Sequence, residues 1–390
     1  MARPVDVAVI GGGIVGTATA TFLAEAGASV VLYEREALAA GASGRNSGVV
    51  QHPFDPALVP LYEETLEIYR RAGESLGRPI AALDAPPDGL LLVSHDRAGV
   101  LTLATELARA FPALRPDFVE GPVLAALEPA LAPDVVACRL DMGYPVIPSA
   151  PTYAFATLAE RAGVPIRLGR EARPVVEAGR CVGVEVAGRL EPAGAVVVAA
   201  GPWTGGLVDP NGEWNPIRPV WGVVVETLLA NPPRHVMEEA EMDEALGTSD
   251  PSRARDSAAA AAERPEFSLI TAAGASAVGS TFLEAEPDPA AWTERLLAHG
   301  TTFVPGIMDA PIREVRACAR PMSRDGRPIV GAIPWIEGLF LASGHGPWGI
   351  STGPASARQV ADLVLGRQAG IDAAFSPARF AWQPSLEASR

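Results

Sequence analysis

The sequence predicts an α/β fold divided between two domains, and three observations support this. The chain has 390 residues, more than the roughly 150 of a typical single domain. Residues 5–34 read as a strand, a glycine turn, a helix and a second strand, the order of a parallel-sheet unit. Residues 215–229 and 267–286 instead read as a long strand and a hairpin pair, which favours an antiparallel sheet in the second domain.

Charge and cysteine content exclude several classes of protein. The chain carries 31 Lys and Arg against 46 Asp and Glu, a formal net charge of −15, so it would repel the phosphate backbone of a nucleic acid. Its three cysteines lack metal-ligand spacing, which argues against a disulfide scaffold or a metal site. No apolar run approaches the roughly 20 residues of a membrane span, and the N-terminus lacks a signal-peptide pattern. We therefore expect a cytoplasmic protein with no nucleic-acid partner, no metal and no integral membrane segment.

The N-terminal segment VDVAVIGGGIVGTATATFLAEAGASVVLYERE carries a dinucleotide-binding motif. Gly11, Gly13 and Gly16 fit the pattern G-x-G-x-x-G between an apolar strand and a helix. Such glycines allow a tight turn, close approach of the backbone to a pyrophosphate and close packing of the helix on the strand. The helix N-terminus supplies N–H donors for the phosphates. Glu34, at the end of the second strand, can accept from both ribose hydroxyls of an adenosine and would repel the extra phosphate of NADP.

The loop after this acid favours FAD over NAD. An NAD-binding unit normally continues into another strand and helix, whereas residues 41–55 (GASGRNSGVVQHPFD) are rich in small polar residues. A loop of this composition suits a path along an extended cofactor, with an ordinary flexible loop as the alternative. The donors that can reach a pyrophosphate and a flavin ring belong to Ser43, Arg45, Asn46, Ser47 and Gly48.

Two later segments read as buried strands that end in glycine turns. Residues 195–200 form a continuous apolar run that ends in Gly201-Pro202-Trp203. Residues 339–343 read as a second such strand, which breaks at residues 344–347 before a helix from about 352 to 365. Apolar runs of this kind fit strands that are buried on both faces.

Together and in this order, these four segments resemble the FAD-dependent D-amino acid oxidase family, in its glycine oxidase and sarcosine oxidase branch. The resemblance implies a Rossmann-like FAD-binding domain of the glutathione reductase type with an inserted α+β antiparallel-sheet substrate domain. It assigns residues 1–80, 145–214 and 315–390 to the FAD-binding domain and residues 81–144 and 215–314 to the substrate-binding domain. The stretch 235–265, acidic and then alanine-rich, is predicted to be a loop or a lid.

The resemblance also implies which residues border the cofactor. It places Val175 against the adenine, and the turn before the last helix against the flavin pyrimidine, where electron density accumulates on reduction. The predicted FAD-binding residues are Gly11, Gly13, Ile14, Val15, Gly16, Glu34, Arg35, Ser43, Arg45, Asn46, Ser47, Gly48, Val175, Ala200, Gly201, Trp203, Cys318, Gly344, Gly346, Trp348, Gly349, Ile350 and Ser351.

The arginine-rich segment REVRACARPMSRDGRPIVG (313–331) is predicted to supply the substrate site. In glycine oxidase-like relatives the arginine at the place of Arg320 holds the substrate carboxylate, which suits a planar guanidinium. The alternative for Arg320 is a salt bridge within the core. Arg324 and Arg327 are predicted to face solvent, and Arg313 and Arg316 stay unassigned.

Cys318 lies where sarcosine oxidase-like proteins carry a cysteine bonded to the flavin. Such a bond requires a thiolate, and neighbouring arginines would lower the pKa of the thiol. The alternative, which we favour, is non-covalent FAD with Cys318 packed against the flavin ring.

Three further residues are candidates for contact with the substrate. His345 and His52 could act near the flavin, because imidazole titrates near neutral pH, although a structural role is favoured for both. Several relatives carry a second cation where this chain has Pro347, so Tyr144 or Arg45 could complete carboxylate recognition.

The predicted reaction is oxidation of the C–N bond of a small amino acid, which is D-configured, glycine or N-alkylated. Hydride would pass to flavin N5 and leave an imine that water hydrolyses. The alternatives are oxidation of a 2-hydroxy acid and a flavoprotein redox subunit without its own turnover. Sarcosine oxidases use a lysine to activate oxygen, and the corresponding position in this chain falls near Ala277. The resemblance therefore leaves the electron acceptor open, as O2 or as a quinone or other acceptor.

Overall fold

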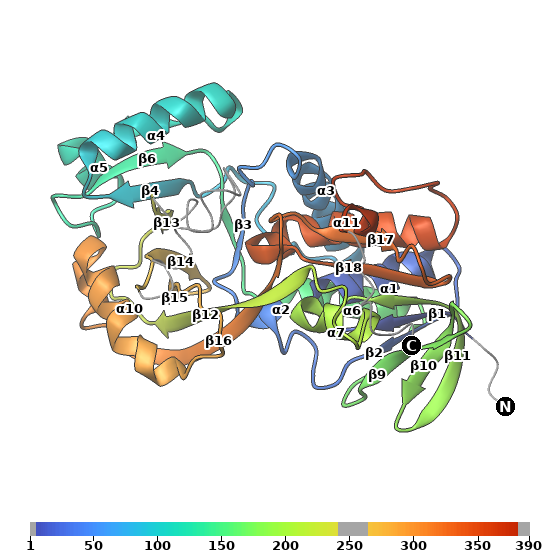
Figure 1. Ribbon diagram of the computed structural model, residues 1–390. Coiled ribbons are helices and arrows are strands. Elements are labelled where there is room, and N and C mark those ends of the chain that lie inside the picture. The colour runs from blue at the N-terminus through green and yellow to red at the C-terminus, as the bar shows by residue number, and fades with distance from the viewer. Residues whose placement is uncertain (1–4, 241–263, 381–390) are drawn as a thin grey trace.

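Two β-sheets organise the chain. The computed structural model describes residues 5–240 and 264–380. Within those residues each of the two main sheets has eight strands. Figure 1 shows them in two lobes, with the chain crossing between the lobes along the long strands β12 (Ile217–Thr227) and β16 (Ile312–Ser323).

The first sheet is the parallel sheet that the N-terminal motif predicts. β1 pairs in parallel with β2 and β11, and β18 extends the parallel order beyond β11. The antiparallel strands β10 and β9 branch from β11. The strand order is β17 (Ile329–Ala332), β18 (Leu339–Ser343), β11 (Arg189–Val198), β1 (Val5–Ile10), β2 (Val30–Tyr33) and β8 (Ile166–Arg167), with β10 (Arg180–Val186) and β9 (Ala172–Glu177) attached.

Both faces of the first sheet are covered, as continuous apolar strands require. Val7 and Val9 face a core that includes the helices, whereas Ala8 and Ile10 face a second core on the other side. Four helices contribute to the first core: α1 (Ile14–Glu25), α3 (Val59–Leu76), α6 (Ala150–Arg161) and α11 (Gly349–Val364).

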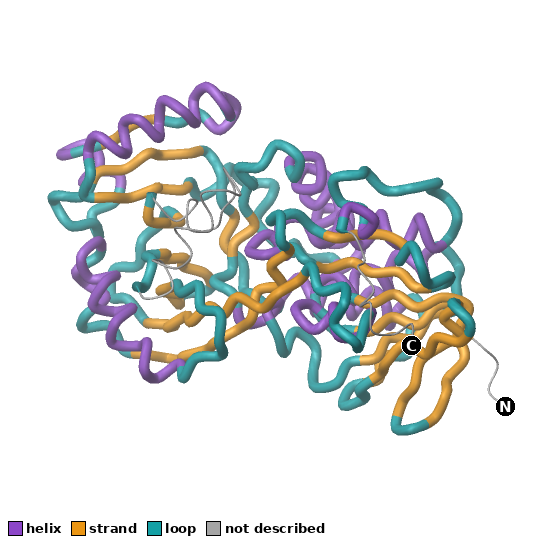
Figure 2. The backbone as a smooth tube through the Cα atoms, viewed as in Figure 1, coloured by secondary structure: helices purple, strands orange, loops and turns teal. Residues whose placement is uncertain are grey.

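The second sheet is antiparallel except where β13 pairs with β4 in parallel. Helix α5 (Gly121–Leu127) and helix α10 (Pro289–Phe303) share a core with one face of it, and α4 (Arg97–Ala110) shares a core with the other. These helices lie along the outside of the lobe in Figure 2. The strand order is β16 (Ile312–Ser323), β12 (Ile217–Thr227), β15 (Ala275–Gly279), β14 (Ser268–Ala272), β13 (Val236–Glu239), β4 (Leu90–Ser94), β6 (Val136–Leu140) and β5 (Asp117–Val119).

The strand pairing bears on one of the proposed domain boundaries. β16 pairs with β12 from Ile312 to Ser323, so the second sheet extends past residue 315 and we move that proposed boundary to the turn after Ser323. The stretch 235–265 was predicted as a loop or lid, but its start is wrong in detail because residues 236–239 form β13. Most of that stretch lies outside the described residues.

The last helix begins earlier than its sequence pattern suggests. Gly344 and Gly346 have φ of 77° and 54°, the left-handed region that glycine adopts without strain. The chain turns there and enters a short 3₁₀ helix, Gly346–Trp348, that leads directly into α11. The helix therefore starts at Gly349 rather than near Thr352, which brings its first turn to the glycine turn.

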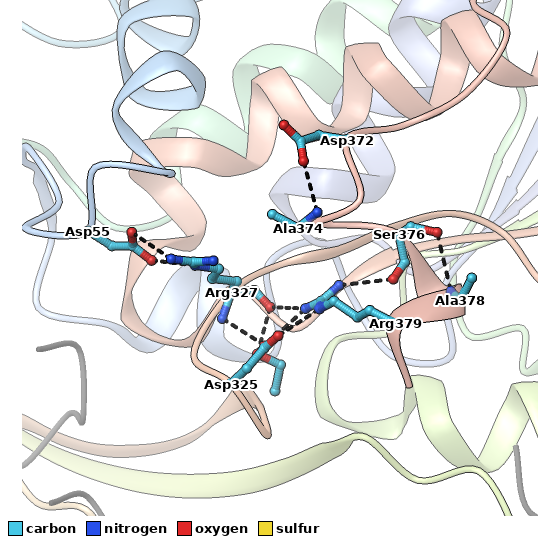
Figure 3. Close-up of polar contacts among 9 residues, drawn as sticks. Asp55, Asp325, Arg327, Asp372, Ala374, Ser376, Ala378 and Arg379 are labelled. Atoms are coloured by element: carbon cyan, nitrogen blue, oxygen red, sulfur yellow. Dashed lines mark hydrogen bonds and ion pairs between the residues drawn. The ribbon is translucent and has the colours of Figure 1, made fainter. Parts of the chain in front are cut away.

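Arg327 does not simply face solvent. Its Nε atom donates to Asp55 Oδ2 at 2.7 Å, and Nη2 donates to Asp55 Oδ1 at 3.2 Å. Arg379 donates in the same way to Asp325 and to the carbonyl of Arg327, as Figure 3 shows. These contacts tie the turn after β16 to the loop after β3 (Val49–Val50) and to the C-terminal segment. Arg324 is exposed, as predicted.

Candidate active site

A cavity of about 690 Å³ runs between the two sheets, within the size range of cofactor and substrate sites. Its walls come from the glycine turn after β1, the loop at residues 40–51, the strands β12 and β16, and the N-terminus of α11. Segments far apart in the chain thus meet along one elongated space. No helix among the described residues is long and apolar enough to cross a membrane. No group of three metal-ligating side chains occurs in that part of the chain.

The glycine turn has no space for side chains. Gly11 has φ of 116°, and a Cβ atom there would collide with the carbonyl oxygen of Ala199. A Cβ atom at Gly16 would collide with the carbonyl oxygen of Gly11, so Gly16 serves helix packing rather than the cavity wall. Glu34 Oε2 accepts from the Gly12 N–H at 2.6 Å, which fixes the carboxylate beside the turn.

The loop after β2 is held from both sides. Ser43 Oγ accepts from the Ile14 N–H at 3.0 Å, which joins the short helix α2 (Ala42–Arg45) to the start of α1. Arg316, with only 6% of its side chain exposed, donates from Nε to the Arg45 carbonyl at 3.3 Å and from Nη2 to the Asn46 carbonyl at 3.2 Å. Its Nη1 atom donates to Glu226 at 2.6 Å. The previously unassigned Arg316 therefore fastens this loop to the second sheet.

The N-terminus of α11 closes another side of the cavity. Ser351 Oγ accepts from the Gln51 N–H at 3.0 Å, so the helix and the loop strand are in contact. His345 is buried, and its Nε2 atom has no hydrogen-bond partner among the described residues. Burial lowers the pKa of His345 to about 4, which keeps the imidazole neutral at physiological pH. A neutral ring with an orphaned nitrogen at the cavity wall is suited to contact with a bound group.

Arg320 lies across β12. A Cβ atom at Gly222 would come within 2.5 Å of Nη1, so only glycine permits the guanidinium to lie there. Nη1 donates to the Thr281 carbonyl at 2.9 Å and Nη2 to Ser280 Oγ at 2.5 Å, while the ring of Phe282 stacks at 4.6 Å from Cζ. No described carboxylate forms an ion pair with Arg320, and burial lowers the pKa of its guanidinium. Two of its five donors are used, so the group remains able to bind an anion.

Cys318 lines the cavity with 5% of its surface exposed. Burial raises the pKa of its thiol, although Arg320, Arg316 and Arg45 act in the lowering direction. The arginines act on this pKa in the expected direction, but desolvation of a thiolate outweighs their charge, so the net shift is upward. The thiol stays protonated, which disfavours a covalent bond to the flavin.

Most of the predicted cofactor residues line the cavity, and three do not. Gly16 packs inside the motif, Gly344 lies in the turn behind the wall, and Val175 lies on β9. Ala172 and Arg173 of β9 reach the cavity instead.

His52 and Tyr144 do not line the cavity, so the structure does not support contact of either side chain with the substrate. The rings of Tyr62 and Phe111 lie 5.2 Å and 5.5 Å from the His52 ring, and burial lowers the pKa of His52. Tyr144 pairs with Val50 in the small β3–β7 ribbon (β7 is Tyr144–Pro145) and packs against the first core. Both are structural here.

Several residues that line the substrate side of the cavity were missed from the sequence. Gln51 lies in the loop at residues 41–55, one position before His52. The second sheet contributes the others, Trp221, Gly222, Glu238, Ser268, Ser280 and Phe282. They carry no local motif.

Residues 6–363 match the family described as FAD dependent oxidoreductase (DAO). The chain belongs to this family, and it is therefore an enzyme whose cofactor is FAD. The residues present fit that group, because the glycine turn allows backbone contact and His345, whose Nε2 atom has no partner among the described residues, lines the same cavity.

Individual relatives support the same assignment. A glycine oxidase from Pseudomonas putida is 27% identical over 397 residues, which cover 95% of this chain and 97% of that protein. A D-amino acid dehydrogenase from Cereibacter sphaeroides is 33% identical over 231 residues, or 57% of this chain and 47% of that protein. The predicted family and its amino acid-oxidising branch are confirmed.

Solved structures confirm the predicted fold. Glycine oxidase from Geobacillus kaustophilus superposes with a TM-score of 0.80 at 23% identity, covering 97% of this chain and 100% of that one. Iminodiacetate oxidase from Chelativorans sp. BNC1 gives a TM-score of 0.79 at 23% identity, covering 95% and 98% of the two chains.

Proposed function

We propose that this enzyme oxidises the C–N bond of a small amino acid whose carboxylate is bound by Arg320. Bound FAD supplies a hydride acceptor. The protein residues bind the carboxylate, orient the carbon that carries the nitrogen, and keep water from that carbon. The walls at Trp221, Ile270 and Phe282 are apolar and suit the last task.

The observation that carries the proposal is that Arg320 has only neutral hydrogen-bond partners among the described residues. A partly buried guanidinium without an ion-pair partner among the described residues is costly to maintain. Ser280 and Thr281 satisfy part of it with neutral acceptors, and a substrate carboxylate would supply the missing charge through two parallel hydrogen bonds. The neutral His345 adds no competing positive charge at the same wall.

Anaerobic bleaching of the flavin tests the reaction class. The panel contains D-amino acids, glycine, N-methyl amino acids and 2-hydroxy acids. We expect amino acids to bleach the flavin, whereas bleaching by hydroxy acids alone would overturn the proposal. Absence of bleaching by every compound would favour a redox subunit. Repeating the productive reaction with O2 and with a quinone identifies the electron acceptor.

An Arg320→Lys variant tests the binding residue. Lysine keeps a positive charge but loses the paired donors, so we expect the substrate Kd to rise about 100-fold, equivalent to about 2.7 kcal/mol. Arg218→Lys is the matched control, because Arg218 lies on the same sheet, half exposed, and pairs with Glu284 outside the cavity. An unchanged Kd in Arg320→Lys, with the flavin spectrum intact, would contradict the assignment.

A further inference from the structure

Three consecutive residues after β15 hold the guanidinium of Arg320. Ser280 Oγ accepts from Nη2 at 2.5 Å, and the Thr281 carbonyl accepts from Nη1 at 2.9 Å. The ring centroid of the next residue, Phe282, lies 4.6 Å from Cζ. We call residues 280–282 the arginine cradle. Each of these three contacts is made by a neutral group, so the cradle holds the guanidinium without neutralising it.

The arginine cradle is fastened to β12 by contacts of its own. The Val223 N–H donates to Thr281 Oγ1 at 3.0 Å, and Thr281 Oγ1 donates to the Trp221 carbonyl at 3.2 Å. Leu283, directly after the cradle, exchanges two backbone hydrogen bonds with Trp221, at 2.7 Å and 2.9 Å. These contacts fix the backbone on both sides of Phe282, which gives its ring a defined place beside the guanidinium.

Phe282 supports the charge of Arg320 without using its hydrogen-bond donors. The face of an aromatic ring carries a negative potential and attracts a guanidinium that lies over it. Because the contact is made through the face, all the N–H donors that Ser280 and Thr281 leave unused stay available. Both Arg320 and Phe282 are partly buried and line the cavity, where such a contact is stronger than at an open surface.

Other stacked arginines in the described chain differ from Arg320 in what accompanies the ring. Four of them also pair with a carboxylate, namely Arg35, Arg97, Arg167 and Arg379. In those four the carboxylate itself helps to fix the side chain. No described carboxylate does so at Arg320, and the ring of Phe282 therefore takes a larger part in fixing the guanidinium.

We propose that Phe282 is a positioning residue, which holds the guanidinium of Arg320 in the orientation that a substrate carboxylate requires. This inference rests on the proposed function, since it needs the carboxylate at Arg320. An arginine side chain that is free to turn must be ordered when the carboxylate binds, and this ordering weakens binding. The ring orders the guanidinium beforehand and leaves its remaining donors to the carboxylate oxygens.

Propanoate and propanamide test the inference in a binding measurement. The two ligands have nearly the same shape, but only propanoate is charged. Neither has an α-amine to be oxidised, so the binding of both can be followed through the flavin absorbance. We expect the wild type to bind propanoate at least about 10-fold more tightly than propanamide, because only propanoate forms charged hydrogen bonds with Arg320.

The Phe282→Leu variant keeps an apolar side chain and removes the ring. We expect the Kd of propanoate to rise about 10-fold, equivalent to about 1.4 kcal/mol, which is the scale of ordering one long side chain. The Kd of propanamide should change by less than about 2-fold. Phe282→Tyr retains the ring and should keep the wild-type preference. Ile270→Val shortens another apolar side chain that lines the cavity and should change the two Kd values by the same factor.

Steady-state kinetics give a second readout. In Phe282→Leu we expect KM for the amino acid substrate to rise about 10-fold and kcat to change by less than about 2-fold, because the bound carboxylate itself orders the guanidinium once it is in place. A general loss of structure would instead lower kcat and weaken FAD binding. If Phe282→Leu does not fold, Phe282→Met provides the same comparison, since methionine also fills the space without a ring.

The outcomes separate the two proposals. If the wild type binds propanoate no more tightly than propanamide, Arg320 does not bind a carboxylate and both proposals fail. If the wild type prefers propanoate and Phe282→Leu retains that preference, Arg320 binds the carboxylate without help from the ring and only this inference fails.

Discussion

Replacement of Arg316 by lysine tests how the second sheet holds the cofactor loop. The guanidinium donates to Glu226 and to the carbonyls of Arg45 and Asn46. A lysine ammonium can keep the contact with Glu226 but cannot reach all three acceptors in one plane. The two carbonyls would then lose partners at a cost of about 1 kcal/mol each.

The size of the effect follows from these two bonds. If the loss of about 2 kcal/mol falls on the loop conformation that contacts FAD, the Kd for FAD rises about 30-fold. We would measure it by adding FAD to the apoprotein and following the quenching of flavin fluorescence. Unfolding of the apoprotein in urea, measured in parallel, reports any general loss of stability.

Arg313 provides the matched control for this experiment. It pairs with the same Glu226 carboxylate at 3.2 Å, but its side chain is 59% exposed. Arg313→Lys should therefore change the free energy of unfolding by less than about 0.5 kcal/mol and leave FAD binding unchanged. The reasoning would be refuted if Arg316→Lys bound FAD as tightly as the wild type while its apoprotein became less stable, since Arg316 would then hold only the strand.

Four further predictions concern single residues. Burial and the neighbouring Glu239 raise the pKa of Glu266 to about 7, so the folded chain binds this proton more tightly than the unfolded chain and stability falls as pH rises from about 4.5 through 7. Glu266→Gln should flatten that slope in urea unfolding, and an unchanged slope would assign it elsewhere. Acid precipitation of the wild type should release FAD into the supernatant, because the Cys318 thiol is protonated, whereas a yellow pellet would contradict this. Gly11→Ala should weaken FAD binding at least about 100-fold, as the added Cβ atom collides with a carbonyl and the positive φ is strained; normal reconstitution would count against the glycine turn as the binding site. His345→Gln should leave the pH profile of kcat/KM unchanged between about pH 6 and 9, because the ring is already neutral there.

The sequence alone predicts those structural elements that depend on residues close together in the chain. The glycine turn and the strand at residues 339–343 lie where their patterns predict them. Each depends on residues that are neighbours in the chain, such as a glycine with positive φ or an uninterrupted apolar run.

The choice of His52 failed because of strand alternation. Val49 and Gln51 line the cavity, whereas Val50 is fully buried in the first core and His52 packs among aromatic rings. Side chains alternate in direction along an extended segment, so only one of the two adjacent polar residues can face the cavity. The chemistry of imidazole favours His52 as the candidate. The sequence of the loop does not show that Gln51, one residue earlier, is the one that faces the cavity.

The contact between Gln51 and Glu238 at the cavity wall could not be found from the sequence. Gln51 and Glu238 are separated by 187 positions, and Glu238 stands in an acidic stretch that resembles a solvated loop. Only the pairing of β13 with β14 and β4 reveals that this residue belongs to a sheet and faces the cavity. Long-range strand order is the information that local patterns lack.

The arginines at 313–327 differ in function because they differ in what neutralises them. Arg313 and Arg316 share Glu226, and Arg327 pairs with Asp55. Arg320 has hydroxyl and carbonyl partners and an aromatic face, but no described carboxylate. A charge that is already paired contributes structure, whereas a partly buried charge with only neutral partners retains the capacity to bind an anion. The distribution of carboxylates around the segment, rather than the arginines themselves, therefore assigns the substrate role to Arg320 in our proposal.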